Sequence, residues 1–431
     1  MNKADSPSGN SKPSSKRYRT LYTHIGDPLY RNSYYLMANT IVTSALGFIF
    51  WIVVARFYSE TEVGLGAAII SAIMLLVSLG KLGFDVGLIR FLSKVEKPSE
   101  FINSCLSINV LVSLLIAVIF VIGINIWSSP LSFIRENIIF ALAFIIFTAF
   151  LTLSSVLDSI FIAKRRAGFV LSKNTVISLT KLVLPFVFVH FFRTGGIVSS
   201  LGVATSIAVI IYLAIFLPKA QSGYKPRFRI DLNVIKEARK YCFSNYAIGI
   251  IASAPGYVVP LLIVNRLGPE YNAYYYMASM ISGVLAVIPN AVAQSLFAEG
   301  SHFEDQLERN MHRSYKFIFI LLIPAVILVS LCGKWLLMAF GSGYSENGLL
   351  LLRILCISSL FTGINSVYTS ILLVKHRLWE LTALVSFTGI FLLTMIYFLT
   401  PIIGIAGIGC ALLATYGIIS IYIILALRRL H

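Results

Sequence analysis

The chain has 431 residues, of which 58% are hydrophobic and only 12% are charged, and its mean hydropathy is +0.85. Charged residues make up about 25% of a soluble globular protein, so this composition excludes that class and indicates a polytopic membrane protein. The formal net charge of +17 would suggest a nucleic-acid partner in a soluble domain, but in a membrane protein it must first be compared with the positive-inside rule.

Residues 1–30 precede the first apolar run and are rich in Ser, Pro, Gly and basic residues. They lack the apolar core of a cleavable signal peptide, so we expect a disordered basic cytoplasmic tail. The five cysteines are scattered without CxxC or Cys/His ligand spacing. We therefore expect neither a metal site nor a disulfide framework, and no cofactor motif is recognisable.

Apolar runs long enough to cross about 30 Å of hydrocarbon as helices occur twelve times. The predicted spans are 34–56, 64–92, 102–126, 138–163, 169–191, 196–217, 242–264, 271–297, 315–333, 348–374, 378–400 and 404–427. The sequence therefore predicts an all-α polytopic membrane protein with about twelve transmembrane helices.

Lysine and arginine residues sort strongly to one side of the membrane if the amino terminus is placed inside. Most of them, Lys173 included, then fall in inner segments, and few fall in outer ones. This bias predicts cytoplasmic amino and carboxyl termini, with residues 428–431 as a short carboxyl-terminal tail. It also explains the basic isoelectric point without nucleic acid.

An internal repeat divides the chain. Shifted by 210 positions, IVVARFYSETEVGLGAA (52–68) lies over LIVNRLGPEYNAYYYMA (262–278). We expect six-helix halves over 31–217 and 242–427, joined by a cytoplasmic linker over 218–241 that carries an amphipathic interfacial helix. Each half has an even number of spans, so both insert the same way round. This predicts a pseudo-twofold axis along the membrane normal and a central cleft.

Charged residues within spans are the first candidate site residues, because charge in hydrocarbon usually faces a cavity or another charge. The span 64–92, read as one helix, carries Lys81, Asp85 and Arg90. Lys81 and Asp85 are four residues apart and can pair on one helix face. Arg90 lies near the inner surface, where its long side chain can instead reach the interface.

Three more intramembrane charges lie in other spans. Lys181 is near the midplane of span 169–191, Asp158 is in the inner third of span 138–163, and Arg353 is nearer the outer end of span 348–374. Lys181 is the strongest candidate for the centre of a transport path, with pairing to an aspartate, Asp158 or Asp85, as the structural alternative. For Arg353 the alternative is again that its side chain reaches the interface.

These charges predict a discontinuous path. Lys81, Lys181 and Arg353, at inner, middle and outer depth, would suit an anionic phosphate or diphosphate group. Asp85, Asp158 and Arg90 would act as gates or counter-charges. An amphiphile with an anionic head and a lipid tail fits this arrangement in an apolar bundle better than an inorganic ion does.

Small polar residues follow helical spacing in spans one and seven. They include Asn39 and Thr43 in the first span and Ser253 in the seventh, where Thr43 and Ser253 correspond under the 210-residue shift. Such residues either line a cleft or pack helices together through hydrogen bonds.

The opening of the chain resembles a known family. The resemblance lies in the stretch RNSYYLMANTIVTSALGFIFWIVVARFYSETEVGLGAAIISAIMLLVSLGKLGFDVGLIRFLSK. This stretch starts with RN, its first span ends in ARFYS, an E-x-G turn follows, and LGFDVGLIRF ends its second span. It resembles polysaccharide biosynthesis proteins of the Wzx flippase type, in the multidrug/oligosaccharidyl-lipid/polysaccharide (MOP) exporter superfamily. The resemblance implies a plasma-membrane flippase, not an enzyme, that needs no cofactor and has cationic residues in its central cavity.

The resemblance also implies a substrate and a direction. The flippase would move a polyprenyl-diphosphate-linked oligosaccharide from the inner to the outer leaflet by alternating access, for envelope polysaccharide or glycan assembly. Its partners would be this lipid-linked oligosaccharide, membrane lipids and polysaccharide assembly enzymes, with no nucleic acid.

Two other functions stay open. A cation-coupled multidrug exporter of the same superfamily would use Asp85 or Asp158 as its coupling acid, although span 34–56 lacks the acid that this branch often carries. A membrane glycosyltransferase or polysaccharide polymerase would need catalytic groups on a substantial outer loop, and the longest outer connections, 127–137 and 333–347, are short.

Overall fold

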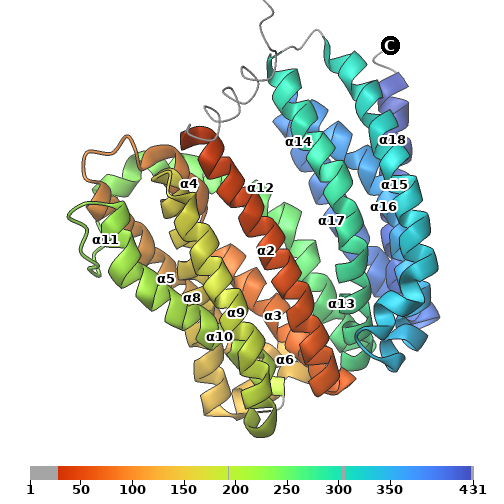
Figure 1. Cartoon of the computed structure of the whole chain (residues 1–431), viewed down its shortest axis with the longest axis horizontal. Coiled ribbons are helices and arrows are strands. Elements are labelled where there is room, and N and C mark those ends of the chain that lie inside the picture. The colour runs from red at the N-terminus through yellow and green to blue at the C-terminus, as the bar shows by residue number, and fades with distance from the viewer. Residues whose placement is uncertain (1–27, 193, 303–305, 429–431) are drawn as a thin grey trace, which may run out of the picture.

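The computed structural model describes residues 28–192, 194–302 and 306–428, in which all regular structure is helical. Twelve helical segments of this part are long and apolar enough to span a membrane, which confirms the predicted all-α, twelve-span architecture (Figure 1). Most of the expected tail over 1–30, and residues 429–431, lie outside the described residues.

The membrane-spanning helices follow the predicted spans closely. They are α2 (Pro28–Phe57), α3 (Glu60–Gly80), α5 (Pro98–Ile122), α8 (Ile138–Ala163), α9 (Ala167–Phe192), α10 (Thr194–Ile211), which continues through η2 (Tyr212–Phe216) into α11 (Leu217–Ala220), α12 (Leu232–Arg266), α13 (Pro269–Gly283) with α14 (Val287–His302), α15 (Leu307–Met338), α16 (Ser342–Val374), α17 (Leu378–Ile403) and α18 (Ala406–Arg428). Short helices α4 (Phe84–Phe91), α6 (Ile124–Trp127) and α7 (Phe133–Glu136) lie between them.

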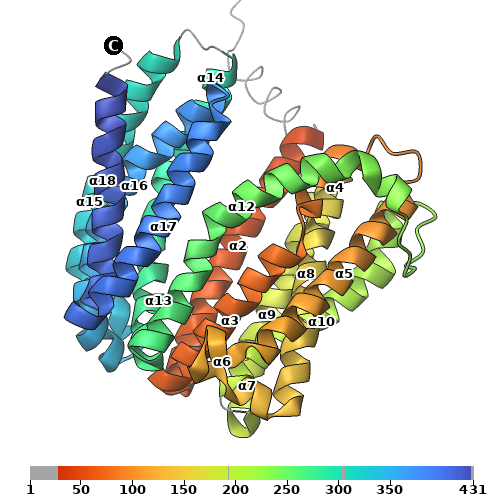
Figure 2. The ribbon, with the colours of Figure 1, turned by 180° about the vertical axis from the view of Figure 1, so that it is seen from behind.

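The helices form two bundles, α2 to α11 and α12 to α18 (Figure 1). The bundles converge at one end of the molecule and diverge toward the other, and the described chain begins and ends at the divergent end (Figures 1 and 2). We call the divergent end the terminal face and the convergent end the opposite face.

The internal repeat is visible at matching helix ends. In the two halves Arg56 and Arg266 both lie in a last helical turn, and Glu60 and Glu270 both lie in a first one. The structure adds a match between the α8–α9 and α16–α17 turns, where Arg165 (φ 55°) and His376 (φ 53°) share the left-handed backbone conformation. These matches agree with two six-helix repeats.

The span predicted over 64–92 is not one helix, and that expectation was wrong. The helix α3 ends at Gly80, and α4 begins at Phe84 after a turn in which Leu82 (φ 49°) and Gly83 (φ 76°) are left-handed. Glycine adopts this backbone conformation without steric cost. A Cβ at position 83 would also lie 2.2 Å from the carbonyl oxygen of Cys242, so the break lets the chain pack closely against α12.

The linker begins in α11 and a turn over 221–223, and residues 224–231 then follow without regular secondary structure. A helix begins at Leu232, within the linker, and continues without a break into span seven. The helix α12 is therefore a single helix of 35 residues with Pro255 and Pro260 inside it. In Figure 2 the start of α12 runs across the terminal face of the first bundle before the helix turns down along the second.

Polar contacts join the two halves at the opposite face. The Arg56 guanidinium donates to the carbonyl oxygens of Met338 (2.8 Å) and Ala339 (2.9 Å). The Asn272 side chain donates to the carbonyl oxygen of Gly64 (2.7 Å). Two further contacts between the halves pair Thr61 with Glu270 and Tyr274 with Glu60. The opposite face is therefore closed in this conformation.

A substitution at Gly64 should prevent this closure. A Cβ there would lie 1.7 Å from the carbonyl oxygen of Pro269, so Gly64→Val should force α3 and α13 apart. We expect a longer distance between spin labels at Ile126 and Trp335, two exposed positions near the opposite face, measured by double electron–electron resonance. The control is Gly47→Val, where nothing lies within 4 Å of a Cβ. An unchanged distance in Gly64→Val would contradict the close contact.

Candidate transport site between the two halves

A cavity of about 450 Å³ opens between the halves, bounded by α3, the α3–α4 turn, α4, α8 and α12. Its polar lining comes from both halves and consists of Ser78, Lys81, Asp85, Ser154, Ser155, Asp158, Tyr246, Ser253 and Tyr257. Lys81 follows the last residue of α3, and Asp158 lies five residues before the end of α8. Both helix ends point toward the terminal face, so the cavity lies in that half of the bundle (Figure 1).

The first charged pair in the cavity spans the break after α3. The Lys81 ammonium lies 2.8 Å from Asp85 Oδ2, and the two side chains are 25% and 24% exposed. The predicted pairing is therefore present, although it crosses a turn instead of following one helix face. Because the pair is partly open to the cavity, another anion has access to Lys81.

In a second pair the cation is far more deeply buried, whereas the Asp158 side chain is 25% exposed. Lys173 on α9 is 0% exposed, and its ammonium lies 3.1 Å from Asp158 Oδ1. The same nitrogen donates to the carbonyl oxygen of Ser154 (2.9 Å) and to its hydroxyl oxygen. A buried charge costs several kcal/mol unless it is paired and hydrogen-bonded. Here three acceptors surround the ammonium, which explains how Lys173 is accommodated.

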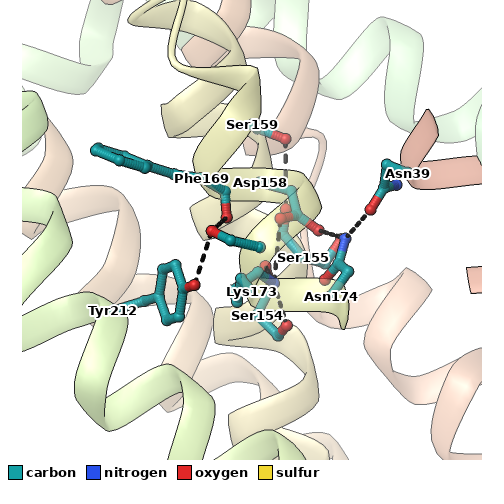
Figure 3. Close-up of polar contacts among 10 residues, drawn as sticks. Asn39, Ser154, Ser155, Asp158, Ser159, Phe169, Lys173, Asn174 and Tyr212 are labelled. Carbon is teal, nitrogen blue, oxygen red and sulfur yellow. Dashed lines mark hydrogen bonds and ion pairs between the residues drawn. The ribbon is translucent and has the colours of Figure 1, made fainter. Parts of the chain in front are cut away.

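The network extends to the first helix. The side-chain amide of Asn174 donates to Asp158 Oδ2 (3.3 Å) and to Asn39 Oδ1 (3.2 Å). Figure 3 shows these side chains pointing toward one another from α2, α8 and α9. Polar groups in a bilayer need internal partners, so this network ties three helices of the first half together behind the cavity wall.

The small polar residues separate into two groups. Ser253 lines the cavity, and its hydroxyl oxygen lies 3.4 Å from that of Ser78 in the other half. Asn39 and Thr43 are outside the described lining. Asn39 accepts from Asn174, and Thr43 donates to the carbonyl oxygen of Asn39 within its own helix (2.6 Å).

Lys181 lies outside the cavity lining in this conformation. It is partly buried on α9, with its ammonium 5.1 Å from the ring centre of Phe50 on α2. The aspartates considered as its partners, Asp158 and Asp85, bind Lys173 and Lys81 instead. Lys181 therefore has a cation–π environment between two helices.

The two predicted arginines also lie apart from the cavity lining. Arg353 is exposed on α16, on the face it shares with the exposed Leu350 and Ile357. Arg90 is exposed on α4, with its guanidinium 4.1 Å from the ring centre of Tyr241. The structure thus brings Lys81, Asp85, Asp158 and Ser253 together, and it does not join Lys81, Lys181 and Arg353 in one cavity.

Among the charged residues of the site, Lys173 is the one that the sequence analysis missed. The count of basic residues places Lys173 among the cations of the inner face, although this residue falls inside the predicted span 169–191, one span after Asp158. An opposite pair of charges in consecutive antiparallel spans was the available signal.

Comparison with known proteins places the chain in a family. The model of the polysaccharide biosynthesis protein family matches residues 29–301, more than half of the chain. The chain belongs to this family. A candidate O-antigen transporter of Shigella flexneri is 25% identical over 162 residues, which are 37% of this chain and 38% of that protein. The match thus spans less than half of that relative's length.

Solved structures show the same fold. The lipid II flippase MurJ in an inward closed conformation superposes with a TM-score of 0.76 at 14% identity, over 91% of this chain and 87% of that one. An inward-facing multidrug resistance MATE family transporter of the MOP superfamily gives a TM-score of 0.69 at 15% identity, over 90% and 94%. This member of the polysaccharide biosynthesis protein family therefore shares its fold with these transporters, and its described residues include twelve helical segments long and apolar enough to span a membrane.

Proposed function

We propose that this protein moves a polyprenyl-diphosphate-linked oligosaccharide from the inner to the outer leaflet for cell-envelope polysaccharide or glycan assembly. The observation that carries the proposal is the position of Lys81, a cation in a polar cavity between two halves of an otherwise apolar bundle. The cavity suits an anionic head with polar sugars, and the surrounding apolar helices suit a lipid tail.

The two lysines would have different roles. The Lys81–Asp85 pair is partly exposed, and such pairs contribute only about 0–1 kcal/mol. A diphosphate can therefore replace Asp85 at little cost and form charge-assisted hydrogen bonds with Lys81. Lys173 is fully buried and has its own acceptors, so it would hold Asp158 in the cavity wall.

The direction follows from the side on which the cavity opens. The distribution of lysine and arginine predicts that the terminal face is cytoplasmic. In this orientation a head group enters from the inner leaflet while contacts such as Arg56 to Met338 and Asn272 to Gly64 keep the outer end closed. Breaking these contacts and closing the terminal face would release the head outside.

A cation-coupled multidrug exporter is the second candidate. Two carboxylates, Asp85 and Asp158, line the cavity, and a cationic drug could pair with either. The fold shared with a multidrug resistance MATE family transporter agrees with this alternative.

Proteoliposomes containing the full chain distinguish the two functions. We expect protein-dependent movement of a fluorescent polyprenyl-diphosphate oligosaccharide to the other leaflet, read out as dithionite-accessible fluorescence, with protein-free vesicles as the control. Proton- or sodium-driven efflux of a cationic dye, without movement of the lipid-linked glycan, would favour the exporter and overturn the flippase proposal.

A further inference from the structure

The extended segment that follows α11 is bound to the side of α5. We call residues 224–231 the strap. Its backbone N–H groups at Arg227, Arg229 and Asp231 donate to side-chain oxygens of α5, those of Asn103 (3.3 Å), Ser107 (3.1 Å) and Ser104 (3.0 Å), respectively. Alternate N–H groups of an extended chain point to one side, which explains the two-residue spacing of these bonds.

The start of the strap is fixed as well. The Asn103 amide donates to the carbonyl oxygen of Lys225 (3.1 Å), and the buried Tyr224 hydroxyl donates to Asn103 Oδ1 (2.7 Å). Burial raises the pKa of Tyr224 above its usual value, so this hydroxyl remains a donor. The strap is therefore a defined surface of the first half.

The outward side of the strap combines basic and apolar groups. In KPRFRI (225–230) each basic residue is followed by an apolar one. Phe228 is 70% exposed, and Lys225 and Arg227 are exposed as well. Arg229 differs because Glu100 (3.4 Å) and Asp231 (3.8 Å) lie beside its guanidinium. Lys225 and Arg227 are thus the cations that the strap presents outward.

A cavity of about 240 Å³ lies under the strap. The strap contributes Arg227 and Phe228 to its lining, and the helices contribute the polar Asn103 and Ser107 and the apolar Leu106, Val110, Leu153 and Leu213. A cation beside apolar side chains matches an anionic head attached to a hydrocarbon chain.

The depth of the strap agrees with this ligand. With its 25 residues, α5 is roughly 37 Å long, so it extends beyond a hydrocarbon layer of about 30 Å. Ser107 lies roughly 14 Å from the start of α5 by the same rise. The strap bonds to Asn103 and Ser107, so it lies along the first turns of α5, at the end of this helix where the head groups and acyl chains of a bilayer would meet.

We propose that the strap and the cavity beneath it form a binding site for an anionic bilayer phospholipid, with the phosphate near Arg227 and Lys225 and an acyl chain against Leu106 and Leu213. The site lies outside the lining of the transport cavity and does not depend on the proposed flippase activity.

Native mass spectrometry of the full chain tests the site with two defined lipids, phosphatidylglycerol and phosphatidylcholine. We expect the wild-type protein to retain phosphatidylglycerol preferentially. Lys225→Gln/Arg227→Gln should bind it roughly 30-fold more weakly, the effect of two cations at a membrane surface. The matched control is Arg309→Gln/Lys375→Gln, which removes the same charge from exposed positions of the second half and should keep the preference. Equal binding of both lipids by the wild type, or an unchanged preference in the strap variant, would overturn the proposal.

If the strap variant does not fold, hydrogen–deuterium exchange on the wild-type protein tests the proposed phospholipid site instead. Amides of the strap should exchange more slowly in phosphatidylglycerol nanodiscs than in phosphatidylcholine nanodiscs, whereas the α16–α17 turn should not change. Equal exchange of the strap in both would contradict the proposal. Polyprenyl phosphate serves as a third lipid in the mass spectrometry experiment, and its preferential retention over phosphatidylglycerol would assign the site to the transported lipid and overturn the proposal.

Discussion

Asp158→Ala is expected to destabilise the protein by about 3–5 kcal/mol, because it leaves the Lys173 ammonium buried without its counter-charge. Lys173 is 0% exposed, and its ammonium would keep only the two oxygens of Ser154 as partners in the protein. Thermal denaturation of the purified protein in detergent, followed by fluorescence-detected size exclusion, measures the effect as a lower Tm.

Asp85→Ala is the matched control for this prediction. It removes the same group from a Lys–Asp pair that is about one-quarter exposed, so its cost should be only about 0–1 kcal/mol. Asp158→Leu/Lys173→Met removes both charges and should recover most of the lost stability, because a buried ion pair can often be replaced by apolar residues. Similar Tm values for Asp158→Ala and Asp85→Ala would contradict the different roles of the two pairs.

The helices were predictable because bilayer thickness fixes their length. The span predicted over 138–163 coincides with α8, and the others differ by a few residues at most ends. The break after Gly80 was missed because an apolar run does not show whether its backbone stays helical. Lys81, Leu82 and Gly83 form a turn within a hydrophobic stretch, and only the glycines hinted at it.

The sequence predicted how deep the charged residues of the site lie in the membrane, but not which way their side chains point. Sequence spacing placed Lys81 and Asp85 together because they are local neighbours. It could not show which way Lys181 points on α9, and the structure places that residue against Phe50. Nor could spacing show that Lys173 faces Asp158 on a different helix. Contacts between helices depend on their rotation and packing, which one sequence does not reveal.

Lys81→Gln is expected to slow transport of the lipid-linked oligosaccharide at least about 10-fold, because a hydrogen bond from a charged group contributes about 1.5–3 kcal/mol. Stability should change little, since the Lys81–Asp85 pair is partly exposed. Asp85→Asn leaves Lys81 in the cavity without a competing carboxylate, so transport should be retained.

The rate of lipid-linked oligosaccharide flipping by Lys81→Gln, compared with that of Lys375→Gln in proteoliposomes of matched protein content, tests the central claim most directly. Lys375 is exposed in the α16–α17 turn and lies outside the cavity lining. We predict a rate at least about 10-fold lower for Lys81→Gln and a wild-type rate for Lys375→Gln. Wild-type rates for both variants would contradict the assignment of the Lys81 cavity as the path of the anionic head group.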